Sequence, residues 1–156
     1  MNSINEKPTV IYIDDEQNNL IAFEAAFRRD FKIFTAINAA TDLTILSTCE
    51  VHVLITDQRM PGVPGIQLLE EAVKRFPSQS RILVTAYPDK EVLAYAVQNG
   101  HIFDYVLKPW RYEDFKGMIF DAYKEHLEKI QTAMMLKERE EDIRKLDEKI
   151  RSITTL

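Results

Sequence analysis

Short apolar runs alternate with helical patterns along most of the chain. Five runs of β-branched and aliphatic residues each predict a strand, and they are Thr9–Ile13, Phe31–Thr35, Val51–Thr56, Arg81–Thr85 and Ile102–Leu107. Several are apolar almost throughout, which is typical of parallel strands covered by helices on both faces. Between them, apolar residues recur at helical spacing, as in Leu20, Phe23 and Phe27. The alternation predicts an α/β fold with a doubly wound, five-stranded parallel sheet.

The C-terminal part of the chain has a different pattern. From Tyr112 to about Ser152 there is no proline and no strand signal, so we expect one helix of about 40 residues, roughly 60 Å long. Large apolar residues in its second half recur at heptad-like spacing in two successive phases, first Leu127, Ile130 and Met134, then Leu136, Ile143, Leu146, Ile150 and Ile153. Such seams are typical of coiled coils, and the change of phase resembles a stutter.

These patterns predict the organisation of the chain. We expect a globular domain over 1–123 and a helical extension over 124–156, which forms a coiled coil or a linker to an output domain beyond Leu156. Burial of the apolar seams against a second copy predicts a parallel homodimer. The alternative is a lone, solvated helix, because pairs such as Glu140 with Arg144 suit an exposed surface.

Composition and charge narrow the class of protein. Hydrophobic residues make up 46% of the chain and charged residues 29%, as in ordinary globular proteins. The net charge of −5 provides no basic footprint, so we expect no direct binding to nucleic acid. Cys49 is the only cysteine, which excludes an internal disulfide. Because the chain also lacks a signal peptide and an apolar run of about 18 residues, we expect a cytoplasmic protein without a membrane span.

Polar residues with matching chemistry follow the predicted strands. Asp14 and Asp15 follow the first predicted strand, and Asp57 follows the third. Thr85 is the last residue of the fourth strand, and Lys108 follows the fifth. Ligands of open parallel sheets bind at this edge. Clustered carboxylates repel one another unless a cation neutralises them, and Mg²⁺ prefers such oxygen ligands. With a lysine and a hydroxyl available for phosphate oxygens, the set predicts Mg²⁺-assisted phosphoryl transfer to a carboxylate.

Four short motifs in this order resemble the response-regulator receiver domain of two-component signalling. They are Ile13-Asp14-Asp15-Glu16, Asp57-Gln58-Arg59-Met60-Pro61-Gly62, Thr85-Ala86 and the Lys-Pro-Trp variant Lys108-Pro109-Trp110. The resemblance covers about Pro8 to Tyr123, and each motif alone is weak, whereas four at successive strand ends are specific. It implies the flavodoxin-like strand order 2-1-3-4-5.

The resemblance also implies roles at the acidic site. Asp57 is the expected phosphoacceptor, with Mg²⁺ bound directly by Asp15, Asp57 and the backbone carbonyl of Arg59, and through water by Asp14. The phosphodonor implied by the family is a sensor histidine kinase or a phosphotransfer protein. The family resemblance implies a regulatory phosphoacceptor that assists only its own phosphorylation and dephosphorylation, not an enzyme.

Further residues are implied to sense the phosphoryl group. Lys108 would contact it, and the Lys108–Pro109 peptide bond is expected to be cis. Thr85 would move toward the phosphorylated aspartate, and Tyr105, three residues before Lys108, would follow it inward as a switch.

Two other functions remain to be weighed. Haloacid-dehalogenase-like phosphatases also use a strand-end aspartate and Mg²⁺, but they need a second aspartate where Arg59 stands. A purely structural coiled-coil module leaves the carboxylates unexplained. His52, His101 and His126 show no metal-ligand spacing and Cys49 has no activating neighbour in the sequence, so all four are interpreted as structural or exposed.

Overall fold

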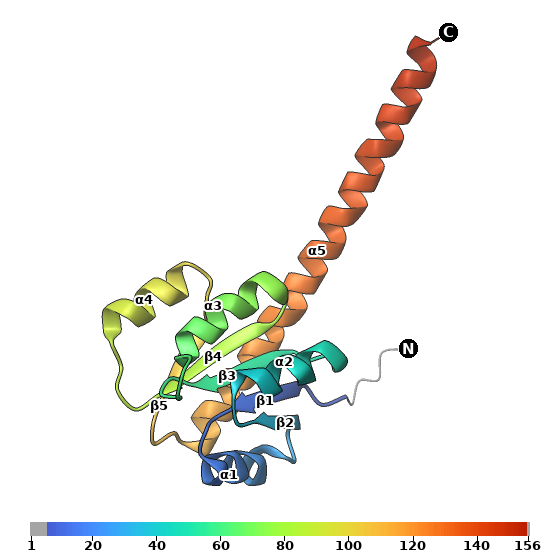
Figure 1. Cartoon of the computed structure of the whole chain (residues 1–156). Coiled ribbons are helices and arrows are strands. Elements are labelled where there is room, and N and C mark those ends of the chain that lie inside the picture. Colours follow the sequence, from blue (N-terminus) through green and yellow to red (C-terminus); the bar gives the residue numbers. More distant parts are fainter. Residues whose placement is uncertain (1–5, 156) are drawn as a thin grey trace. The chain divides into compact units, whose positions relative to one another are not determined.

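The computed structural model describes residues 6–155, apart from the side chain of Leu43. Strands and helices alternate along the chain (Figure 1). The elements are β1 (Thr9–Ile13), α1 (Gln17–Phe27), β2 (Lys32–Ala36), α2 (Ala39–Thr48), β3 (Val53–Asp57), α3 (Gly65–Arg75), β4 (Ser80–Thr85), α4 (Lys90–Gln98), β5 (Asp104–Leu107) and α5 (Tyr112–Thr154). The predicted strands are therefore all present, with ends that differ by no more than a few residues.

The five strands form one parallel sheet in the order β2-β1-β3-β4-β5, which confirms the predicted fold class. In its register Ile13 of β1 is paired with Thr56 of β3, and Asp57 of β3 with Val84 of β4. The carboxyl ends of the central strands therefore meet at one edge, where Asp14 and Asp57 follow or end neighbouring strands.

The strands are buried because helices cover both faces of the sheet. Val10 and Tyr12 of β1 point into one core, and Ile11 and Ile13 point into the other. The first core is completed by α1 and α5, through Leu20, Phe23, Phe27, Phe115, Ile119 and Ala122. The second is completed by α2, α3 and α4, through Leu46, Leu68, Leu69, Ala72, Leu93 and Ala96. Figure 1 shows α1 on the opposite side of the sheet from α3.

An aromatic cluster closes the first core near the end of β5. Phe27 lies with its ring centre 5.4 Å from that of Trp110 and 5.4 Å from that of Phe115. Trp110 and Phe115 also meet directly, at 5.3 Å. Edge-to-face and tilted contacts of this kind stabilise a core beyond the area that they bury, and they anchor the segment that follows Lys108.

The chain divides into two compact units, Met1–His126 and Leu127–Leu156. The first holds the sheet and its helices. In the second, large apolar side chains of α5 are exposed, including Met134, Leu136, Ile143, Leu146 and Ile150. Among the described residues, no helix has both the length and the apolar character needed to cross a membrane.

Candidate functional site

The three expected aspartates converge at the carboxyl edge of the sheet. One carboxylate oxygen from each of Asp14, Asp15 and Asp57 lies within 4.8 Å of the others, an arrangement that could hold a metal ion. Asp14 and Asp57 are buried, whereas Asp15 is exposed. The donors are all hard carboxylate oxygens, which fits Mg²⁺.

Asp14 is fixed by three hydrogen-bond donors. The Tyr12 hydroxyl donates to Oδ2 at 2.8 Å, the Asn19 side-chain amide donates to the same oxygen at 3.1 Å, and the Glu16 backbone N–H donates to Oδ1 at 3.0 Å. Burial first, and then the Asp14 charge, raise the pKa of Tyr12, so its hydroxyl stays a donor. We did not expect Tyr12 and Asn19 at this site, although Tyr12 lies two residues before Asp14 on a strand and Asn19 lies in the first turn of α1.

Lys108 brings a positive charge to the two buried carboxylates. Its Nζ lies 2.5 Å from Oδ1 of Asp57 and 3.6 Å from Oδ2 of Asp14. Desolvation lowers the pKa of Lys108, but the hydrogen bond and charge of Asp57 outweigh it and the net pKa is raised. The ammonium group is therefore charged. The Lys108–Pro109 bond is cis, as expected.

The net pKa of Asp57 is raised, because the effect of burial exceeds that of the groups that stabilise its negative charge. Burial raises its pKa, and the nearby Asp14 adds to the effect, while Lys108 and the backbone N–H of Arg59 oppose it. That N–H donates to Oδ2 at 3.1 Å. The guanidinium of Arg59 lies 4.0 Å from the centre of the exposed Tyr87 ring, a cation–π contact.

Gly65 at the start of α3 fixes the path of the chain after Asp57. Its N–H donates to the Gln58 carbonyl at 3.0 Å, and a Cβ at this position would lie only 2.2 Å from the carbonyl oxygen of Asp57. No side chain fits there, because real Cβ atoms do not approach backbone so closely. The sequence offered no sign of this role beyond the two prolines that precede the glycine.

Thr85 and Tyr105 lie on adjacent strands, β4 and β5. Thr85 is buried, and its Oγ1 accepts a hydrogen bond from the Tyr87 N–H at 3.2 Å. Tyr105 is half-buried against the second core and is paired with Leu83, two residues before Thr85. Side chains two residues apart on a strand share a face, so both residues lie on the face covered by α3 and α4.

The comparison with protein families decides between the interpretations above. The family model of the response regulator receiver domain matches residues 10–120. The chain belongs to this family. Receiver domains are regulatory phosphoacceptors. The family match therefore favours the receiver interpretation over the haloacid-dehalogenase-like phosphatase.

Curated relatives of this receiver are transcriptional regulators. The chain is 33% identical over 105 residues to the hydrogenase transcriptional regulatory protein HoxA of Cupriavidus necator, an alignment that covers 67% of the chain and 22% of that protein. It is 30% identical over 127 residues to the DNA-binding transcriptional regulator NtrC of Proteus hauseri, covering 81% of the chain and 27% of the regulator. The receiver chain thus spans about a quarter of the length of these relatives.

Solved structures show the same fold. The signal receiver domain of an HD domain-containing protein from Pseudomonas fluorescens Pf-5 has a TM-score of 0.73 at 25% identity, covering 79% of this chain and 99% of that one. A CheY-like receiver domain protein from Methanospirillum hungatei JF-1 has a TM-score of 0.72 at 22% identity, covering 80% and 99%. The latter supports the fold alone.

Proposed function

We propose that Asp57 accepts a phosphoryl group from a sensor histidine kinase or a phosphotransfer protein and that the receiver then acts as a phosphorylation-dependent switch. The observation that carries the proposal is the contact of Lys108 Nζ with Asp57 Oδ1, beside the converging carboxylates of Asp14 and Asp15. The carboxylate of Asp57 is the nucleophile, and Lys108 offers a fixed charge to the transferred phosphoryl oxygens.

Mg²⁺ fits the acidic site and would be held by Asp15, Asp57 and the Arg59 carbonyl, with Asp14 acting through water. When bound, the ion neutralises charge on the phosphoryl group during in-line transfer. The pKa of Asp57 stays raised despite Lys108, so the negative charge of its carboxylate is only partly compensated. A bound cation would complete this compensation. Tyr12 and Asn19 would keep Asp14 oriented toward the ion.

The proposed switch uses Thr85 and Tyr105. A phosphoryl group on Asp57 adds acceptor oxygens, and the Thr85 hydroxyl is the donor on the neighbouring strand that can reach them. Its oxygen accepts from the Tyr87 N–H, and the hydroxyl hydrogen is a separate group that would be donated to the phosphoryl oxygen. Tyr105 lies half-buried on the same face, so its position is free to respond.

Acetyl phosphate tests the phosphoacceptor. With Mg²⁺ present, we expect stoichiometric phosphorylation of the chain, complete loss in Asp57→Asn and loss on chelation of the metal. Asp121→Asn, which changes an exposed carboxylate of α5, is the matched control and should remain fully reactive. Stoichiometric phosphorylation of Asp57→Asn, measured by intact mass, would contradict the assignment.

We also propose that residues 124–156 form a parallel homodimer and convey the state of the receiver domain, 1–123, to an output domain or partner. The seam residues Leu136, Ile143, Leu146 and Ile150 are each more than half exposed in the single chain. Burying a large apolar side chain contributes about 1.5 to 3 kcal/mol. The change of phase near Met134 provides two competing registers, which phosphorylation would bias.

Sedimentation of the full chain tests the dimer. Ile143→Glu combined with Ile150→Glu should dissociate it, because both charges would face the partner helix. Lys145→Gln combined with Lys149→Gln makes the same change in net charge at polar positions and should leave it dimeric. A wild-type chain that stays monomeric at tens of micromolar, with and without beryllofluoride, would refute the proposal.

A further inference from the structure

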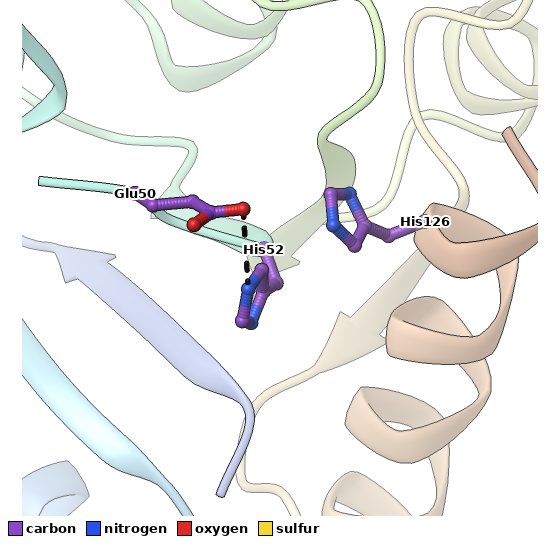
Figure 2. A group of neighbouring side chains, drawn as sticks. All are labelled: Glu50, His52 and His126. Carbon is purple, nitrogen blue, oxygen red and sulfur yellow. Dashed lines mark ion pairs between the residues drawn. The ribbon is translucent and has the colours of Figure 1, made fainter. Parts of the chain in front are cut away.

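A second cluster of ligand-type side chains lies beside the N-terminal end of β3. Glu50 and His52 precede the strand, and His126 reaches toward them from α5 (Figure 2). One ligand atom from each lies within 4.8 Å of the others, and Oε1 of Glu50 lies 3.8 Å from Nε2 of His52. All three residues belong to the first compact unit.

The His126 ring is already oriented as a ligand would be. Its Nδ1 lies 2.7 Å from the carbonyl oxygen of Ser78, and because a carbonyl can only accept, Nδ1 carries the proton. In this tautomer Nε2 keeps its lone pair. Histidines that bind metals almost always donate their other ring N–H to an oxygen in this way.

The His52 ring is held by the backbone of β1. The Thr9 N–H donates to Nδ1 at 3.0 Å, and the His52 and His126 ring centres lie 4.9 Å apart. The cluster thus brings two imidazole rings into contact beside one carboxylate. Neutral imidazole is the form that binds metal ions.

We propose that Glu50, His52 and His126 bind a divalent transition-metal ion of the Zn²⁺ class. Two imidazoles and one carboxylate form a known ligand set for Zn²⁺, and three protein ligands leave a fourth position open. Mg²⁺ prefers oxygen ligands and should not compete for this site. The exposed Glu50 carboxylate is the ligand that can move to close the coordination sphere.

Binding must break the hydrogen bond from Thr9 to His52. If Nδ1 of His52 binds the ion, its lone pair is no longer available to Thr9. If Nε2 binds the ion, the proton of the neutral ring moves to Nδ1, which then cannot accept. The Thr9 backbone N–H is therefore a reporter of the site whichever nitrogen is used.

The ion can enter from solvent. A groove of about 670 Å³ borders Glu50 and His52 and is also lined by Thr9, Cys49 and Lys32. The bound ion would join α5, at the last residue of the first unit, to the segment that leads into β3. Because an ion that binds only the folded chain stabilises it, Zn²⁺ should also raise the unfolding temperature.

Titration of the full chain with Zn²⁺, in millimolar Mg²⁺ to occupy the aspartate site, tests the proposal. We expect one Zn²⁺ per chain and a shift of the Thr9 amide signal in nitrogen-15 NMR spectra. His52→Asn and His126→Asn should each weaken binding roughly tenfold or more. Asparagine can still accept from Thr9 at position 52 and donate to Ser78 at position 126, so these variants remove a ligand while keeping the structural hydrogen bonds.

His101→Asn is the matched control, since this histidine lies outside the cluster, and it should bind Zn²⁺ as the wild type does. Glu50→Gln should weaken binding without changing the unfolding temperature in the absence of Zn²⁺. If both cluster variants bind Zn²⁺ as tightly as the wild type, or if the Thr9 amide does not respond, the site is not a metal site. Acetyl phosphate reactivity of the same variants, expected to be unchanged, keeps this outcome separate from the function of Asp57.

Discussion

The two ends of β3 gather different chemistry from the same sheet. At the carboxyl end, Asp57 meets other carboxylates and the ammonium group of Lys108. At the N-terminal end, His52 meets a second imidazole and one exposed carboxylate. Parallel strands bring side chains together at both edges, so the ligand type at each end decides which cation is favoured there.

The two ends also differ in how charge is compensated. The carboxyl end carries its own cation in Lys108, whereas the N-terminal end is held by hydrogen bonds between rings and backbone. The first arrangement suits a charged ligand, and the second fixes the orientation of two imidazole rings. Burial therefore has opposite chemical consequences at the two ends, because it raises the pKa of a carboxylate and lowers that of an imidazole.

The largest expected effect comes from Asp42, a buried carboxylate with neither a neighbouring cation nor a hydrogen-bond donor among the described residues. It lies in the first turn of α2, and among the described residues neither of its side-chain oxygens has a hydrogen-bond partner. Burial raises its pKa from 3.8 to about 7. The folded chain thus holds this proton to higher pH than the unfolded chain, and stability should fall as pH rises from about 4 to 7, by up to about 4 kcal/mol.

Urea unfolding of Asp42→Asn at pH 4, 6 and 8 checks this. The stability of Asp42→Asn should not fall between pH 4 and pH 8, and at pH 8 its free energy of unfolding should be larger than that of the wild type. Asp121→Asn should have the stability of the wild type at each pH. Parallel curves for Asp42→Asn and the wild type would show that burial of this carboxyl has no cost, and would remove the contrast with Asp57.

Lys108→Ala should impair the chemistry at the carboxyl end of β3 and leave the N-terminal end unchanged. Loss of a fixed charge beside the transferred group should slow phosphorylation by acetyl phosphate by about 10² to 10³ fold. Lys90→Ala on α4 is the control and should react at the wild-type rate. Zn²⁺ titration of Lys108→Ala should match the wild type, and a weakened response there would mean that the two ends are coupled through β3.

A smaller effect is expected from a change in the backbone packing around Asp57, at Gly65. Gly65→Ala places a Cβ against the Asp57 carbonyl and should lower stability by about 1 to 3 kcal/mol and slow phosphorylation as Asp57 shifts. Gly117→Ala, in α5 with open space around its Cβ position, should instead raise stability by about 0.5 to 1 kcal/mol. Equal effects of the two changes in urea unfolding would show that the close approach at Gly65 is tolerated.

The sequence predicted one end of β3 and not the other for a physical reason. Asp57, Thr85 and Lys108 each stand directly at a predicted strand end, where general rules place ligands, and their motifs occur in a fixed order. His52 and His126 lie far apart in the sequence, and their proximity depends on where α5 packs. Gly65 was missed because its role is a through-space distance to a carbonyl, which no local pattern encodes.

Trp110 is an intrinsic fluorophore next to the aspartate site. It is the only tryptophan of the chain, it stands two residues after Lys108, and its ring packs against those of Phe27 and Phe115. Indole emission depends on the polarity and packing around the ring, so a shift of Lys108 on phosphorylation would reach this fluorophore through the adjoining proline. The intrinsic fluorescence of the unmodified protein should therefore report the proposed phosphorylation of Asp57, and with it the rate of phosphoryl transfer and the lifetime of the phosphorylated state.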